Sequence, residues 1–221
     1  MMTRAQYDDL VRQGYNRIPL VAECYADLDT PLSIYLKLAN SRNTFLLESV
    51  VGGERSGRYS FIGLPSDTVI EVIERQSRVL QGSAGVEQEV ESHQGDPLAF
   101  IESFHARFKV PTIPDMPRFF GGLAGYFGYD SVRYMEPKLE ASRKADDLGT
   151  PDILLMLTDR MAVVDNIKGT IQLVVFVDPD TADAYSQGCA ELDALMQKLQ
   201  TPAKAPACQP TPETEIDRSM S

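Results

Sequence analysis

The stretch that decides the fold is Phe45 to Leu64, which reads FLLESVVGGERSGRYSFIGL. Two apolar-rich runs, Phe45–Val51 and Arg58–Leu64, flank the polar link Gly52–Gly57, which contains three glycines. Runs joined in this way are typical of a β-hairpin whose loop is longer than two residues. We therefore predict that the two runs form neighbouring antiparallel strands.

Polar side chains gather at one end of this predicted hairpin. Glu48 and Ser49 interrupt the apolar run near the end of the first strand, and Arg58, Tyr59 and Ser60 open the second. A carboxylate, hydroxyls, a guanidinium and an aromatic ring form a set that can hold a small zwitterion. The alternative interpretation is that Glu48 and Arg58 form a cross-strand pair on a solvated face, with Ser49 starting a turn.

Bulk composition indicates a globular protein with a substantial core. The chain has 221 residues, of which 43% are hydrophobic and 24% charged. Its net charge of −11 argues against a nucleic-acid partner, because phosphate binding needs clustered Lys and Arg. No window approaches the ~20 apolar residues of a membrane span, and the N-terminus resembles no signal peptide. We therefore predict a cytoplasmic protein without membrane contact.

Cysteine and histidine usage limits the chemistry. The three cysteines, Cys24, Cys189 and Cys208, are far apart and lack a CxxC spacing, so neither a disulfide framework nor a zinc site is indicated. The two histidines, His93 and His105, have no ligand-like residue nearby. A His-dependent nucleophilic site is not expected in this chain.

Capping residues and apolar periodicity predict the helices. A Thr or Asp followed by Pro supplies an N-cap and a first residue that needs no N–H partner, and apolar residues three and four apart mark a buried face. The helices expected are Thr3–Arg12, one from Thr30-Pro31 to Leu38, Leu98–Phe108, a short one from Tyr129-Asp130 to Met135, and one within Asp178–Leu199.

Apolar runs bounded by turn residues predict further strands. These are Asn16–Cys24, placed at a sheet edge or strand start by Pro19, then Thr68–Glu74, Ser77–Gln81, Pro151–Thr158, Met161–Asp165 and Thr170–Val177. Between them we expect a surface excursion at Gly82–Gly95, a rigid connector at Lys109–Arg118 and a charged loop at Glu136–Thr150.

The segment Phe119–Asp130, FFGGLAGYFGYD, carries four glycines among large residues. It lacks the GxGxxG and GK[ST] patterns of phosphate-binding loops. We interpret it as a strand in which glycine lets another backbone or a bulky ring approach closely.

Counting gives eight or nine strands, many of them joined as hairpins, and four or five helices. This pattern favours an α+β fold with a large, mostly antiparallel, sandwich-like sheet and helices packed on the outside. We expect one ordered domain over residues 1–200. Thr201–Ser221, with four prolines and few apolar residues, reads as a flexible linker toward something that follows it.

Three blocks in order carry a family resemblance: Leu46–Ser49 with Gly57–Gly63, then Gly121–Asp130, supported by Gly14–Leu20 and Asp29–Leu38. With these blocks the chain resembles the N-terminal region of anthranilate synthase component I, from about Tyr15 to the end of the last predicted helix. That family makes anthranilate from chorismate and ammonia with Mg²⁺, in L-tryptophan biosynthesis. A separate glutamine amidotransferase subunit, component II, supplies the ammonia.

The resemblance also implies site residues. It places the feedback pocket for L-tryptophan at the Leu-Leu-Glu-Ser block, with Ser49 as the primary contact, Glu48 and Leu47 beside it, and Tyr59 as a wall of the indole site. Some relatives use a lysine near the second strand. Here the nearest cations are Arg55 and Arg58, so the partner of the ligand carboxylate stays open between them.

The family's chorismate- and Mg²⁺-binding carboxylates, catalytic His and Gly-Ala-Pro-Lys block belong to a C-terminal half, and nothing in this sequence resembles them. We therefore expect a regulatory, partner-contacting segment that is inactive alone and holds no catalytic residue or metal ligand of its own. Two alternatives stay open: a fragment of aminodeoxychorismate synthase component I, and a free-standing amino-acid-binding module without enzyme activity.

Overall fold

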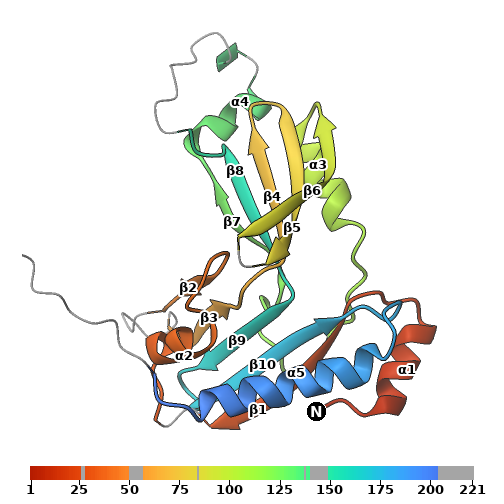
Figure 1. Cartoon of the computed structure of the whole chain (residues 1–221), viewed down its shortest axis with the longest axis vertical. Helices are drawn as coiled ribbons and strands as arrows, with labels where there is room; N and C mark the ends of the chain where they lie inside the picture. Colours follow the sequence, from red (N-terminus) through yellow and green to blue (C-terminus); the bar gives the residue numbers. More distant parts are fainter. Residues whose placement is uncertain (26–27, 50–56, 84, 137, 140–148, 204–221) are drawn as a thin grey trace, which may run out of the picture.

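The computed structural model describes residues 1–25, 28–49, 57–83, 85–136, 138–139 and 149–203. Within them the strands form two five-stranded antiparallel sheets, here called sheet A and sheet B, which Figure 1 shows one above the other. Sheet A has the order β1 (Ile18–Tyr25), β10 (Thr170–Val177), β9 (Arg160–Asp165), β3 (Tyr59–Gly63), β2 (Phe45–Leu47). Sheet B has the order β6 (Val86–Gln94), β5 (Gln76–Ser83), β4 (Thr68–Ile73), β8 (Ile153–Thr158), β7 (Gly122–Phe127).

The chain passes between the sheets at two adjacent points. Residues 64–67 lead from β3 in sheet A to β4 in sheet B, and Asp159 alone separates β8 in sheet B from β9 in sheet A. The fold class predicted from the sequence, α+β with antiparallel strands, is confirmed. The large sheet is divided in two because these short links turn the chain from one sheet into the other.

The described residues contain five α-helices, and the first three of them begin at a predicted capping residue. They are α1 (Arg4–Arg12), α2 (Pro31–Leu38), α3 (Pro97–His105), α4 (Val132–Met135), which follows the 3-10 turn η1 (Tyr129–Ser131), and α5 (Ala184–Leu199). Thr3 and Thr30 each cap a helix through a capping box, and Asp96 accepts hydrogen bonds from the N–H groups of Leu98 and Ala99.

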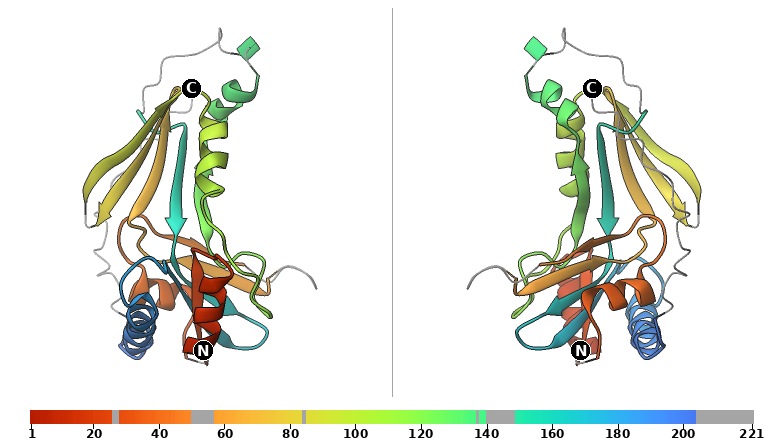
Figure 2. Two further views of the ribbon diagram at one scale, coloured as in Figure 1. Left: turned by 90° about the vertical axis from the view of Figure 1, so that its right-hand side faces the viewer. Right: turned by 90° about the vertical axis from the view of Figure 1, so that its left-hand side faces the viewer.

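Helices cover one face of each sheet. Residues of α1, α2 and α5 pack with one face of sheet A in a single buried cluster that includes Ile34, Leu192, Leu173 and Ile62. Phe100 and Phe104 of α3 pack on sheet B, and α3 lies alongside that sheet in Figure 2. These two clusters account for the apolar periodicity of the helices.

The other face of sheet A has a different cover. Met161, Val163 and Val174 are buried there against Phe119 and Met116 of the segment between α3 and β7. In the described part of the chain this face therefore carries a loop segment and aromatic rings in place of a helix.

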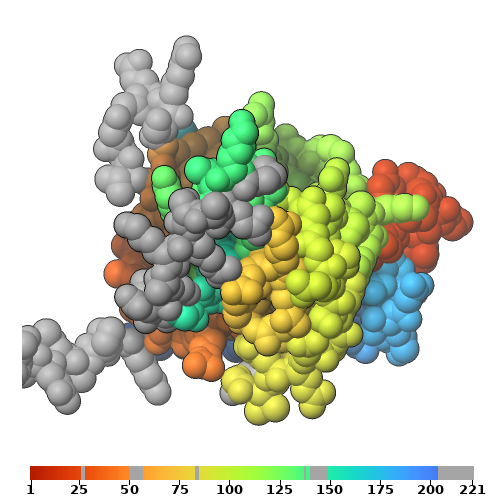
Figure 3. Space-filling view, turned by 90° about the horizontal axis from the view of Figure 1, so that it is seen from above, coloured from red at the N-terminus to blue at the C-terminus, as the bar shows by residue number. Residues whose placement is uncertain are grey.

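One structural prediction is wrong: Gly82–Gly95 contains a strand. Residues of β6 pair with β5 along its length, yet all nine side chains of β6 are exposed except the half-buried Glu91. The strand forms the edge of sheet B and lies at the surface in Figure 3. Because neither face of β6 is buried, its sequence has no apolar alternation that would indicate a strand.

Two other predictions fall partly on residues that are not described. The predicted linker Thr201–Ser221 lies outside the described residues from 204 onward, as does most of the loop Glu136–Thr150. Among the described helices, none is long and apolar enough to span a bilayer.

Candidate functional site

The predicted site residues lie at one end of the β2–β3 hairpin. The strands pair antiparallel, with Leu47 opposite Phe61, which confirms the predicted hairpin. Ser49 follows β2, and its backbone N–H donates to Ser60 Oγ at 3.3 Å, so the chain beyond Leu47 stays beside β3. The hairpin loop, which includes Arg55, lies among residues 50–56, outside the described part.

An aromatic surface lies on the face of the hairpin opposite the helices. Tyr59 and Phe61 share this face, with ring centroids 6.2 Å apart, and Phe119 stands edge-on to Phe61 at 5.5 Å. Leu47, directly across from Phe61, is 54% exposed. An apolar side chain beside partly covered rings is a surface on which a planar aromatic ligand can pack.

Arg58 is held by an acid that the sequence did not indicate. Its Nε and Nη2 donate to Asp165 Oδ2 at 3.2 and 2.9 Å, and its guanidinium lies 4.7 Å from the centroid of the Tyr59 ring. Asp165, at the end of β9, is buried and lies opposite Tyr59 in the sheet. The interpretation of Glu48 and Arg58 as a cross-strand pair is therefore wrong, because the partner of Arg58 comes from β9.

Asp165 stays ionised in this environment. Burial raises the pKa of its carboxyl, but hydrogen bonds from Arg58 and from the backbone N–H groups of Lys168 and Ile167 outweigh that effect and hold the pKa below its ordinary value. The Arg58 side chain is still 45% exposed, and a guanidinium has five N–H donors. Arg58 is thus oriented by Asp165 and can still donate to a ligand carboxylate.

A buried hydroxyl fixes the position of Ser49. Ser60 is fully buried, and its Oγ accepts from the Ser49 N–H and from Asn166 Nδ2, both at 3.3 Å. The backbone N–H of Asn166 also donates to the Arg58 carbonyl at 2.7 Å. The Ser49 hydroxyl, half-buried, has no hydrogen bond to any residue that the structure describes. It is therefore available to a ligand.

The exposed Glu48 completes the set between Leu47 and Ser49. At this end of the hairpin the Ser49 N–H contacts Ser60 and the oriented Arg58 guanidinium lies against the Tyr59 ring. Sequence reasoning missed Ser60, Asp165 and Asn166 as supports. Asp165 and Asn166 stand more than a hundred residues from the hairpin in sequence, at the end of the predicted strand Met161–Asp165, and no sequence pattern links them to the hairpin.

Within the described ranges, no group of three or more His, Cys, Asp or Glu side chains could hold a metal ion. The residues present therefore do not fit the Mg²⁺ that the resemblance implies for the family's reaction.

Comparison with known proteins gives a consistent result. The chain is 50% identical over 97% of its length to anthranilate synthase component 1 of Neisseria meningitidis serogroup B, and 53% identical over 91% of its length to that of Pseudomonas aeruginosa. The chain is homologous to anthranilate synthase component 1. It spans 44% and 40% of these two relatives.

Two further comparisons complete the picture. No protein-family model matches the chain. A solved structure, anthranilate synthase component I from Streptococcus pneumoniae, has a TM-score of 0.48 and 22% identity, covering 81% of this chain and 36% of that one. The resemblance to anthranilate synthase component I inferred from the hairpin and the glycine segment is confirmed by the curated relatives.

Proposed function

We propose that this chain is the tryptophan-sensing part of an anthranilate synthase component 1. The whole enzyme would convert chorismate and ammonia to anthranilate and pyruvate in L-tryptophan biosynthesis, under feedback inhibition by L-tryptophan. The observation that carries the proposal is the 50% identity to anthranilate synthase component 1 over nearly the entire chain. The arrangement of Ser49, Arg58 and Tyr59 at one end of the hairpin supports it.

The ligand would meet three kinds of group. Its indole ring would pack on Leu47, Tyr59 and Phe61, and burying ~150–250 Å² of ring surface at ~25 cal/mol per Å² favours binding by roughly 4–6 kcal/mol before ordering costs. Its carboxylate would accept from Arg58, which Asp165 already orients. Its ammonium would be held by the Glu48 carboxylate and the Ser49 hydroxyl.

Regulation requires that the ligand distinguish two states. A ligand with equal affinity for both arrangements shifts neither, so tryptophan would have to favour one arrangement of this chain against a separate catalytic part. The Leu47 and Tyr59 surface faces away from the helices, where such a part could contact it. The proposed partners are this catalytic part and a glutamine amidotransferase subunit, component II, in the cytoplasm. No step proposed for this chain involves Mg²⁺.

The proposal is tested first by direct binding. The chain contains no tryptophan, so fluorescence anisotropy of added L-tryptophan reports binding without background from the protein. Ser49→Phe should abolish the anisotropy increase, because the new ring takes the space of the ligand. Ser49→Ala should weaken binding by only about three- to tenfold, the loss of one hydrogen bond. Ser92→Phe, at an exposed serine of β6, is the matched control and should bind as the unaltered chain.

The second arm uses a full-length anthranilate synthase component 1 that carries this segment. Ser49→Phe should leave anthranilate formation from chorismate largely intact and remove tryptophan inhibition. If Ser49 only began a turn, both Ser49 variants would keep half-inhibition unchanged and would lose thermal stability instead. Unchanged half-inhibition in Ser49→Phe would remove the hairpin from the regulatory site.

A further inference from the structure

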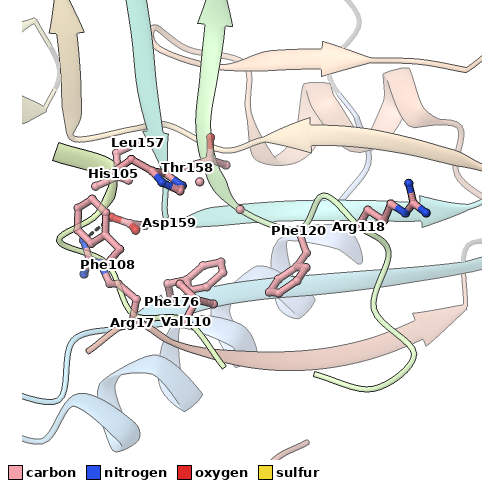
Figure 4. A pocket seen from close by; sticks show the side chains of 12 residues that line it. Arg17, His105, Phe108, Val110, Arg118, Phe120, Leu157, Thr158, Asp159 and Phe176 are labelled. Atoms are coloured by element: carbon pink, nitrogen blue, oxygen red, sulfur yellow. Dashed lines mark hydrogen bonds and ion pairs between the residues drawn. The ribbon is translucent and has the colours of Figure 1, made fainter. Parts of the chain in front are cut away.

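A cavity of about 310 Å³ lies at the junction of the two sheets, beside the link from β8 to β9. Figure 4 shows the rings of Phe108, Phe120 and Phe176 on its walls. Phe120 and Phe176 are stacked, with centroids 5.9 Å apart and planes inclined by 11°. A concave site of this size with three phenylalanine rings on its walls suits a small ligand with an aromatic body.

One end of the cavity carries opposite charges side by side. Arg17 Nη2 donates to Asp159 Oδ2 at 3.0 Å, and the two side chains are only 20% and 30% exposed. The Arg17 guanidinium also lies 5.3 Å from the centroid of Phe108. Arg17 thus keeps further N–H donors beside a carboxylate with a second oxygen, within reach of an aromatic wall.

Asp159 is incompletely compensated by its neighbours. Burial raises the pKa of its carboxyl, and the attraction of Arg17 and Arg160 does not bring the pKa back to its ordinary value. A cationic group on a ligand would therefore stabilise this carboxylate. Arg118 also lines the cavity, so its lining has two arginine charges, from Arg17 and Arg118, against the one carboxylate of Asp159. A carboxylate on the ligand is therefore favoured as well.

We propose that this junction cavity binds an aromatic α-amino acid, with the ammonium on Asp159, the carboxylate on Arg17 and the ring among Phe108, Phe120 and Phe176. The site is separate from the hairpin site, because its polar end is built from Asp159 and from Arg17 just before β1, and none of its lining residues belongs to β2 or β3. It does not depend on the function proposed for the hairpin.

The first test uses amide NMR spectra of the 221-residue chain titrated with L-phenylalanine. Gly121 and Gly122 line the cavity, whereas Gly63 pairs with Phe45 in the hairpin and serves as the control signal. Saturable shifts of Gly121 and Gly122 without a shift of Gly63 are expected. Absence of saturable shifts, or shifts centred on Gly63 and Ser49, would overturn the proposal.

Two truncated ligands separate zwitterion recognition from simple burial of a ring. 3-Phenylpropionate lacks the ammonium and phenethylamine lacks the carboxylate. Each should bind about tenfold or more weakly than L-phenylalanine, since each loses a charge-assisted hydrogen bond. If either binds as tightly as the amino acid, the assignment of Asp159 and Arg17 is wrong.

A charge-removing variant then tests Asp159 itself. Asp159→Asn should weaken L-phenylalanine by about tenfold while 3-phenylpropionate binds at least as well as before. The matched control is Glu71→Gln, which alters the Arg78–Glu71 pair of sheet B, joined at 3.1 Å with side chains 33% and 22% exposed. Equal affinity loss in both variants would contradict a specific role. If Asp159→Asn does not fold, the comparison of the three ligands on the unaltered chain decides.

Discussion

Gly125 in β7 is a position where a single methyl group should lower stability strongly. A Cβ placed there would lie 1.9 Å from the Leu154 carbonyl oxygen and 2.9 Å from the Leu155 Cα. Both atoms belong to the backbone of β8, which pairs with β7 through Gly125 and Leu155. A backbone neighbour cannot rotate away as a side chain can, so Gly125→Ala must move the strands apart.

The size of the effect follows from that distance. Ordinary contact begins at 3.4 Å, so the strands must separate locally by 3.4 minus 1.9, or 1.5 Å. Hydrogen bonds of ~2.9 Å do not survive such a shift. Losing two of them next to the buried strand β8 should lower the free energy of unfolding by about 3 kcal/mol. Gly122→Ala in the same strand is the control: its φ is +109°, but nothing lies within 4 Å of the added Cβ. Backbone strain alone should cost about 1–2 kcal/mol there.

Urea unfolding followed by tyrosine fluorescence measures both variants, because the chain has nine tyrosines and no tryptophan. The expected order of stability is unaltered chain, Gly122→Ala, then Gly125→Ala. If Gly125→Ala unfolds within about 1 kcal/mol of the unaltered chain, β7 accommodates a side chain and the close-approach argument fails.

Two further predictions concern polar contacts. Lys37 Nζ lies 2.8 Å from both oxygens of Asp29, whose pKa is lowered because hydrogen bonds from Lys37 and Ser33 outweigh the effect of burial. Lys37→Met should therefore cost about 2 kcal/mol near pH 7. The loss in melting temperature should shrink as pH falls from the ordinary Asp pKa of about 4 through the lowered pKa of folded Asp29, because the pairing exists only while the carboxyl is ionised. A pH-independent loss would contradict the pairing. Ser60→Ala removes the acceptor shared by Ser49 and Asn166 and should lower the free energy of unfolding by about 1–2 kcal/mol in urea titrations, whereas Ser92→Ala on the exposed face of β6 should have no measurable effect.

Most helices and strands can be predicted from short-range features of the sequence, such as capping residues and apolar patterns. Thr3, Thr30 and Asp96 mark helix starts that the structure confirms, because an N-cap acts within three residues of its own position. The same holds for the hairpin, whose register depends on a contiguous apolar pattern. The edge strand β6 shows the limit: its backbone pairs with β5, but its side chains are solvated, so hydrophobicity carries no information about it.

The division into two sheets could not be predicted from the apolar pattern of the sequence. β8 and β9 read as one apolar stretch interrupted by a single charged pair, Asp159-Arg160, and either one long bent strand or two strands would give that pattern. Asp159 is paired with Arg17 from before β1, more than a hundred residues away. The residue that separates the sheets is thus also the residue that supplies the carboxylate of the junction cavity.

For the hairpin residues, too, the sequence identifies the side chains but not the interactions that they make. Glu48, Ser49, Arg58 and Tyr59 could be named from the sequence because they lie in one short segment, and the family resemblance added Leu47. Their hydrogen-bond partners could not be predicted, because these come from the end of β9 and the residue after it. Arg58 donates to Asp165 and not to Glu48, and Ser60 Oγ accepts from both Asn166 and the Ser49 N–H. Two consequences would follow for the zwitterion that we propose at this hairpin. The guanidinium is already oriented before the ligand arrives, which lowers the ordering cost of binding. Because Arg58 is paired with Asp165, it would not compete with the proposed ligand's ammonium for Glu48. Under the function proposed here, the buried acid of β9 would thus leave Glu48 and Arg58 as two separate binding groups, in place of a pair that neutralises itself.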